Sequence, residues 1–246
     1  MVSYGPEQRV HVPALRAGWL TQAFVHWPYA PDQVQRLLPN KLEVDTYDGT
    51  AWVSLTPFVM AGVRPPGSPA ALPAFLETNL RTYVRGRDGR DGLWFLSIEV
   101  TSPVMLAARA VGVPYHTGRL ELSREQGVRT YSGTRRGGGP AYRVAVRCGA
   151  PVTPTRRDVW LTSRWRAFTR RFGALWETPV EHEPWPLREA ELEGVEESLT
   201  RAVGLPPPAA EPLVHFSDGV RKVRLGLSHP VRPPGAPGTD DGRRRR

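Results

Sequence analysis

A chain of 246 residues is long enough for one large domain or two small ones, and it can bury a core without support from a disulfide or a metal. Hydrophobic residues make up 40% of it, which excludes a disordered protein, and the single cysteine, Cys148, excludes an intramolecular disulfide. The net charge of +9 leaves nucleic acid open as a partner.

Residues 1–9 lack the apolar core of a signal peptide. The longest strongly apolar, uncharged stretch, Gly49–Val63, contains Pro57 and falls short of the ~20 residues that span a bilayer. Together with the low cysteine content, these features predict a cytoplasmic protein that does not cross a membrane.

The first half of the chain is typical of strands separated by turn residues. Trp19–Trp27 is the first expected strand. A short helix is expected over Pro31–Leu38, because Pro31 fits a first helical turn and Pro39 ends it. Asp48-Gly49 predicts a hairpin turn. Further strands are expected over Leu42–Tyr47, Ala51–Met60, Phe75–Arg85 and Leu93–Thr101, with a Pro/Gly-rich loop over Arg64–Pro73.

The second half continues this pattern with two expected helices. A short helix is expected over Thr155–Thr162. A longer one is expected over Leu187–Val203, because apolar residues recur there at near-helical spacing among acidic ones and Gly204 fits its C-cap. Asp218-Gly219 indicates a final hairpin turn. The expected strands are Tyr115–Ser123, Val128–Arg136, Tyr142–Arg147, Trp165–Arg170, Ala174–His182, Leu213–Phe216 and Val220–Leu227.

Many short strands with few helices predict an α+β fold, mostly antiparallel β, arranged as a barrel or a sandwich. The sequence shows no βαβ alternation and no glycine-rich phosphate loop, which argues against a nucleotide-binding Rossmann domain. We expect a single domain over residues 10–228 and a disordered Pro/Gly/Arg-rich tail over residues 229–246.

Several short segments, taken together and in order, carry a family resemblance. They are Phe24-Val25-His26-Trp27, Leu37-Leu38-Pro39, Tyr47-Asp48-Gly49, Pro57-Phe58, Glu77–Val84, Gly92–Phe95, Ala108-Arg109 and Pro114-Tyr115. Through these segments the chain resembles the YqjF-like family, a domain of unknown function (2071) in the acetoacetate-decarboxylase-like superfamily. The resemblance implies a closed, conical antiparallel β-barrel with a few outer helices and an internal pocket.

Acetoacetate decarboxylase itself, by this resemblance, would carry a catalytic lysine pair just after a proline that follows an arginine. The corresponding stretch here is Arg109–His116, in which Tyr115 and His116 stand where the lysines would be. A Schiff base needs an amine nucleophile. The two lysines of the chain lie elsewhere, Lys41 beside a helix end and Lys222 near the C-terminal turn. Schiff-base catalysis is therefore not expected, and neither is a cofactor.

Glu77, Asn79, Arg81 and Tyr83 alternate along the sequence, so they share one face of an expected strand. The pattern alone fits either a solvated face or the lining of a polar interior. The resemblance places this segment at the pocket, where a glutamate and an arginine could orient a carboxylate or carbonyl ligand. Burial would raise the pKa of Glu77 toward neutrality unless Arg81 offsets it, so any acid/base role is assigned to Glu77.

Tyr115 and His116 would point to opposite faces of a strand, so one of them can enter the pocket. The resemblance favours Tyr115 as a hydrogen-bond donor to a bound oxygen, whereas His116 is either an acid/base group or structural. Arg109 is either a pocket cation or a surface anchor. His26 and Trp27 could likewise line or cap the barrel, and for the tryptophan the core is the favoured interpretation.

No metal site is expected. Glu181-His182-Glu183 is the nearest approach to a ligand cluster, but on a strand the two glutamates would face away from the histidine. Cys148 has no histidine close in sequence to activate it, so we interpret it as a structural thiol.

The sequence therefore predicts an internal polar pocket for a small carboxylate or carbonyl ligand, in a protein that either binds the ligand or acts on it without a Schiff base. The alternative is a non-catalytic basic protein that associates with nucleic acid through Arg135-Arg136, Arg156-Arg157, Arg170-Arg171 and Arg243–Arg246. A nucleic-acid partner is disfavoured, because no binding module is recognisable and exposed arginine pairs are usually solvated. The sequence gives no indication of the oligomeric state.

Overall fold

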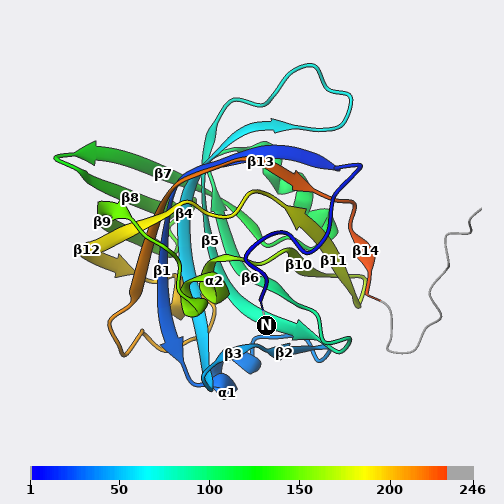
Figure 1. Ribbon diagram of the computed structural model, residues 1–246, viewed down its shortest axis with the longest axis horizontal. Helices are drawn as coiled ribbons and strands as arrows, with labels where there is room; N and C mark the ends of the chain where they lie inside the picture. Colours follow the sequence, from blue (N-terminus) through cyan, green and yellow to red (C-terminus); the bar gives the residue numbers. More distant parts are fainter. Residues whose placement is uncertain (1, 232–246) are drawn as a thin grey trace, which may run out of the picture.

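The computed structural model describes residues 2–231, whose strands form two closed rings that share one wall (Figure 1). The wall consists of β13 (Leu213–Leu225), β1 (Leu15–Tyr29), β4 (Thr50–Arg64), β5 (Phe75–Gly86) and β6 (Asp91–Val100). The first ring is closed by β7 (Tyr115–Glu125), β8 (Val128–Arg135), β9 (Ala141–Pro151) and β12 (Leu187–Glu197). The second ring is closed by β10 (Arg166–Arg171) and β11 (Ala174–Glu181).

Short strands and helices complete the described chain. The strands are β2 (Leu42–Val44), β3 (Thr46–Tyr47) and β14 (His229–Pro230). The helices are α1 (Pro31–Gln35), the 3-10 helix η1 (Pro103–Val111), α2 (Arg156–Thr162) and α3 (Leu199–Ala202).

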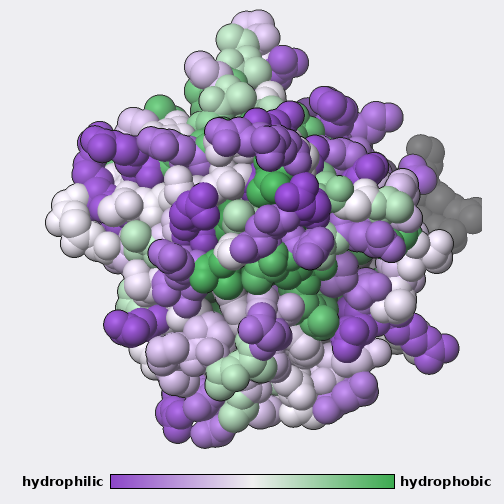
Figure 2. Space-filling model, turned by 90° about the vertical axis from the view of Figure 1, so that its left-hand side faces the viewer, coloured by the Kyte–Doolittle hydropathy of each residue, from purple (hydrophilic) through white to green (hydrophobic). Residues whose placement is uncertain are grey.

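The shared wall is buried on both faces because each face looks into a different ring. Toward the first ring it presents apolar residues such as Val25, Leu55 and Leu80, which pack with Tyr131 and Val144. Toward the second ring it presents mixed polar and aromatic residues, described below. Figure 2 views the molecule from the side of the first ring, where hydrophilic residues dominate and hydrophobic ones gather near the middle.

The structure confirms a mostly antiparallel β fold with few helices. Asp48 and Gly49 have φ values of 49° and 76°, which is the backbone of a tight hairpin turn. α2 begins with a capping box, in which the Thr155 hydroxyl accepts the Asp158 backbone N–H and the Asp158 carboxylate accepts that of Thr155. β6 makes the two parallel pairings, with β7 and β10, and in this way it belongs to both rings.

The predicted helix over Leu187–Val203 was wrong. Residues Leu187–Glu197 form strand β12, and α3 covers the last part, Leu199–Ala202. Exposure alternates along β12, with Ala190 and Leu192 packing against the first-ring core and the glutamates between them facing solvent. The spacing of the apolar residues fits the period of a strand as well as that of a helix. Pairing with β9 and β13 then overrides the helix propensity of alanine, glutamate and leucine.

The final hairpin was also predicted wrongly, because β13 runs as one strand through Asp218-Gly219. Gly219 has a φ of 116°, and the pairing with β1 continues through it in one register, with Gly219 opposite Leu20 and Ser217 opposite Gln22. His229 and Pro230, which fall in the expected disordered tail, form strand β14. Strand β14 pairs His229 with Glu177 of β11, and residues 232–246 lie outside the described part of the chain.

We predict that Gly219→Ala lowers the free energy of unfolding by about 2–4 kcal/mol, because backbone strain and overpacking add. A Cβ at this position would lie 2.2 Å from the Trp19 carbonyl oxygen and 2.6 Å from the Leu20 Cα. Gly127→Ala is the matched control, since Gly127 also has a positive φ but a Cβ added there would come no closer than 3.8 Å to a neighbouring atom. Urea unfolding measures both variants, and equal losses would contradict a close approach of β13 to β1.

Candidate functional site

The polar face of β5 lies inside the second ring and not in solvent. Glu77, Asn79, Arg81 and Tyr83 are 3%, 7%, 6% and 0% exposed. Their backbone partners on β4 extend the same face, since Phe58 lies opposite Glu77, Thr56 opposite Asn79 and Ser54 opposite Arg81. We call the interior around Glu77, Asn79, Arg81, Tyr115 and His26 the inner site.

Three neighbouring strands place His26, Ser54 and Arg81 side by side, because His26 pairs with Ser54 and Ser54 with Arg81. The hydrogen bonds around Ser54 fix the histidine tautomer. Tyr83 donates its single proton to the Leu161 carbonyl at 2.5 Å, so the Ser54 hydroxyl donates to the Tyr83 oxygen at 2.7 Å.

The Ser54 oxygen can then only accept from His26 Nδ1, 2.6 Å away, which leaves the Nε2 atom of His26 unprotonated. Burial lowers the pKa of His26 well below its usual value, so the ring is neutral. Within residues 2–231, this buried Nε2 atom has no hydrogen-bond partner. It is therefore a free proton acceptor in the interior of the protein.

A second histidine lies beside His26. The rings of His26 and His215 are 5.4 Å apart, and His215 donates from Nε2 to Asp158 of α2 at 3.0 Å. This hydrogen bond holds the pKa of Asp158 well below its usual range. The Nδ1 atom of His215 is buried and, in the part of the chain that the structure describes, unpartnered. Each of the two imidazoles thus keeps one ring nitrogen free.

The Arg81 guanidinium is a buried cation that no carboxylate among the described residues approaches within ion-pair distance. Its Nε and Nη2 atoms, which lie along one edge of the group, have no hydrogen-bond partner there either. Its Cζ atom lies 5.6 Å from the centroid of Phe24, whose ring packs edge-on against Trp185 at 5.2 Å. Burial lowers the pKa of Arg81, but an arginine stays charged at neutral pH.

Two other buried arginines, Arg164 and Arg166, form ion pairs with carboxylates. Arg164 lies 3.2 Å from Asp45 and also pairs with Asp91. Arg166 pairs with Glu7 at 2.6 Å and Glu177 at 3.4 Å. Among the described residues, Arg81 differs from both in having no carboxylate within ion-pair distance.

Glu77 and Tyr115 meet at the other end of the inner site, where the Tyr115 hydroxyl donates to Glu77 Oε2 at 3.2 Å. Burial raises the pKa of Glu77 to about 8, and hydrogen bonds from Tyr115 and Asn79 offset this only in part. Arg81 does not offset it, since four residues of strand separate the two Cα atoms by roughly 13 Å. Glu77 is consequently a mostly protonated acid at neutral pH.

Of the remaining candidate residues, Arg109 and His116 lie outside the inner site. Arg109 is exposed on η1, so it is not a cation of the inner site. His116 is half-buried on the opposite face of β7 from Tyr115, beside Glu99 and Arg135. Tyr83 is fully buried and serves as the hydrogen-bond hub described above. Trp27 packs in the first-ring core, as expected.

Sequence reasoning missed Ser54, His215, Asp158 and Trp185. What these residues share is that they lie on the wall face toward the second ring or contact it. Which residues lie on that face depends on how the strands pair. Both lysines, Lys41 and Lys222, are exposed.

The other chemical candidates are occupied by structural contacts. Cys148 is half-buried and accepts a hydrogen bond from Arg129 at 2.7 Å. Arg135 pairs with Glu99 at 2.6 Å, and the Arg171 guanidinium stacks on Trp176 at 3.6 Å, so two of the arginines named for nucleic acid are engaged. Across residues 2–231 there is no cluster of three or more potential metal ligands. Over the same residues, none of the helices has the length and apolar character needed to cross a bilayer.

The fold is similar to that of solved enzymes of the acetoacetate-decarboxylase-like class. An acetoacetate decarboxylase-like enzyme from Sphingomonas wittichii RW1 superposes with a TM-score of 0.62 at 18% identity, over 89% of this chain and 94% of that one. The enduracididine biosynthesis enzyme MppR, solved with pyruvate, gives a TM-score of 0.61 at 17% identity, over 91% and 93%. These similarities show the fold.

The family follows from the sequence. Residues 16–221 match the DUF2071 family of uncharacterised conserved proteins, and the chain belongs to this family. The uncharacterised protein YqjF of Bacillus subtilis (strain 168) is 34% identical over 212 residues, which cover 82% of this chain and 87% of YqjF.

We predict that the stability of the protein falls as the pH rises from about 4.5 to about 8, and that Glu77→Gln removes much of this fall. The folded state holds the Glu77 proton up to a pKa of about 8, whereas the unfolded chain releases it near 4.5. The contribution of the Glu77 proton to the free energy of unfolding is therefore fully present below pH 4.5. Between pH 4.5 and pH 8 it falls by at most about 1.4 kcal/mol per pH unit. Urea unfolding at pH 5 and pH 8 measures the difference.

The matched control is Glu125→Gln, which replaces an exposed carboxylate on β7. It should follow the wild-type pH profile. A Glu77→Gln profile parallel to that of the wild type would show that Glu77 ionises normally.

Proposed function

We propose that the protein binds a small carboxylate, of the size of a short keto or hydroxy acid, in the inner site. The observation that carries the proposal is the buried Arg81 guanidinium with one free edge. A buried cation without a counter-ion costs several kcal/mol. The Nε–Nη2 edge matches the two oxygens of a carboxylate, so a ligand carboxylate supplies the missing partner.

The other groups of the inner site define the rest of the ligand. His26 Nε2 accepts a proton, and the free Asn79 Oδ1 accepts a hydrogen bond, so a hydroxyl or an acidic C–H beside the carboxylate suits them. The protonated Glu77, held by Tyr115, can donate to a carbonyl oxygen at the far end. Arg81 and Glu77 extend from Cα atoms roughly 13 Å apart, and with Asn79 between them they define the length available to a small organic acid. That MppR was solved with pyruvate agrees with this size and charge.

Any chemistry at this site proceeds without a Schiff base. Both lysines, Lys41 and Lys222, are exposed, so neither supplies an amine nucleophile to a ligand bound at Arg81. The arrangement suits proton transfer next to a carboxylate, with His26 as the base and Glu77 as the acid. The nucleic-acid alternative receives no support from Arg135 and Arg171, which already have partners in the fold.

We expect wild-type protein to bind pyruvate, and Arg81→Gln to bind it about 10- to 100-fold more weakly, because a charged hydrogen-bonded pair is lost. Isothermal titration calorimetry measures both. The control is Arg87→Gln, which removes an exposed arginine outside the inner site. Undiminished pyruvate binding by Arg81→Gln would contradict the proposal. So would failure of the wild type to bind pyruvate, lactate and acetoacetate alike.

Borohydride added with pyruvate or acetoacetate should trap no covalent adduct, as read by mass spectrometry of the intact chain. A reduced adduct on Lys41 or Lys222 would overturn the exclusion of Schiff-base chemistry while leaving the carboxylate site untouched.

In the absence of ligand, Arg81→Met should leave the free energy of unfolding unchanged or raise it, because it removes an unpaired buried charge. Arg164→Met should lower it by about 3–5 kcal/mol, because the buried carboxylates of Asp45 and Asp91 would lose the buried cation that they share. A large loss in Arg81→Met would show that Arg81 is structural. Urea unfolding at neutral pH compares the two variants.

A further inference from the structure

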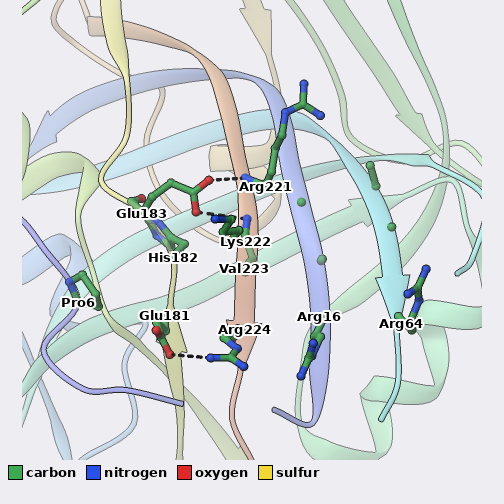
Figure 3. Close-up of a pocket in the computed structure, with 14 residues that line it drawn as sticks. Pro6, Arg16, Arg64, Glu181, His182, Glu183, Arg221, Lys222, Val223 and Arg224 are labelled. Carbon is green, nitrogen blue, oxygen red and sulfur yellow. Dashed lines mark hydrogen bonds and ion pairs between the residues drawn. The ribbon is translucent and has the colours of Figure 1, made fainter. Parts of the chain in front are cut away.

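A second cationic feature lies on the outside of the molecule. Where the segment Glu181–Glu183 approaches β13, β1 and β4, a hollow of about 740 Å³ opens to the surface (Figure 3). We call it the outer hollow. Its basic residues are Arg16, Arg64, Arg221, Lys222 and Arg224.

Three of these arginines form a row across three neighbouring strands. Arg16 of β1 is the register partner of Arg224 on β13 and of Arg64 on β4, so Arg16 lies between the two others, as Figure 3 shows. Adjacent strands are about 4.8 Å apart, and like charges placed directly opposite destabilise a sheet. Such a row is costly unless an anion neutralises it.

The acidic residues of the outer hollow are already engaged. The Glu183 carboxylate accepts the backbone N–H groups of Arg221 at 2.7 Å and Lys222 at 3.2 Å. Glu181 accepts the Val10 N–H at 2.6 Å and is 4.0 Å from Arg224. Counted over residues 2–231, the side chains of Arg16, Arg64, Arg221 and Lys222 take part in no ion pair.

Small residues keep the hollow open beneath these cations. Gly18, Ala61 and Gly62 form part of its lining, and a side chain placed on Gly62, whose φ is 60°, would meet open space. The buried ring of His182 lines the opposite side. The surface is therefore concave and of the size of a metabolite site, not a flat face for a polymer.

We propose that the outer hollow binds a small molecule through a diphosphate or triphosphate group laid along the Arg224–Arg16–Arg64 row. Guanidinium groups one strand apart can each bind a separate phosphate with two hydrogen bonds, which a single carboxylate cannot satisfy. Arg221 and Lys222 add charge at the rim. This site does not depend on the inner site or on its carboxylate ligand.

Isothermal titration calorimetry with inorganic pyrophosphate, at physiological salt, tests the proposal on the full chain. We expect pyrophosphate to bind at least about tenfold more tightly than inorganic phosphate, and Arg16→Gln/Arg64→Gln to lose about tenfold or more. The control is Arg119→Gln/Arg143→Gln, which removes the same charge from exposed positions on β7 and β9. Equal losses in the two double variants, or no pyrophosphate binding by the wild type, would overturn the proposal.

A second measurement locates the probe without any variant. Burial lowers the pKa of His182 to about 4. A bound pyrophosphate beside it favours the charged ring, so the NMR titration of His182 should move to higher pH when pyrophosphate is added. An unchanged His182 titration at saturating pyrophosphate would show that the anion binds elsewhere. Pyruvate binding at Arg81 is measured separately, so either proposal can fail alone.

Discussion

Burial of the shared wall on both faces is the constraint on which the rest of this structure depends. A strand that belongs to one ring can leave alternate side chains in solvent, but β1, β4 and β5 cannot. On the face toward the first ring, these strands bury aliphatic side chains. Their second-ring face buries an arginine, a glutamate and a histidine, which is tolerable only if each polar atom finds a partner in the chain or in a ligand.

The ionic groups divide according to this constraint. Arg164 and Arg166 lie between carboxylates from β6, β11 and the N-terminal segment, and they tie the second ring to the wall. Arg81 lies in the same interior without such a carboxylate, and the free atoms of His26 and His215 accompany it. The buried arginines therefore differ in their counter-ions, since unbonded side-chain nitrogens occur on Arg164 and Arg166 as well as on Arg81.

Local patterns were sufficient to predict most strands, the Asp48-Gly49 turn and the capped helix α2, because those features depend on neighbours in the sequence. The β12 segment was misread because its apolar spacing suits a helix as well as a strand, and pairing with distant β9 decided the outcome. The Glu77–Tyr83 face was open to two interpretations for the same reason, since alternation does not reveal that both faces of β5 are covered. The contribution of Ser54 and His215 follows from register across strands, which a single sequence does not encode locally.

The pairing that closes both rings joins the two ends of the described chain. β1 pairs with β13 from Leu15 opposite Leu225 to His26 opposite Leu213. During synthesis, β1 leaves the ribosome first and has to wait for nearly the whole domain before its partner exists, with one edge and its apolar side chains uncovered. Nascent chains that stall before β13 therefore carry an unpaired strand edge, the kind of surface that chaperones cover and that drives aggregation when they do not.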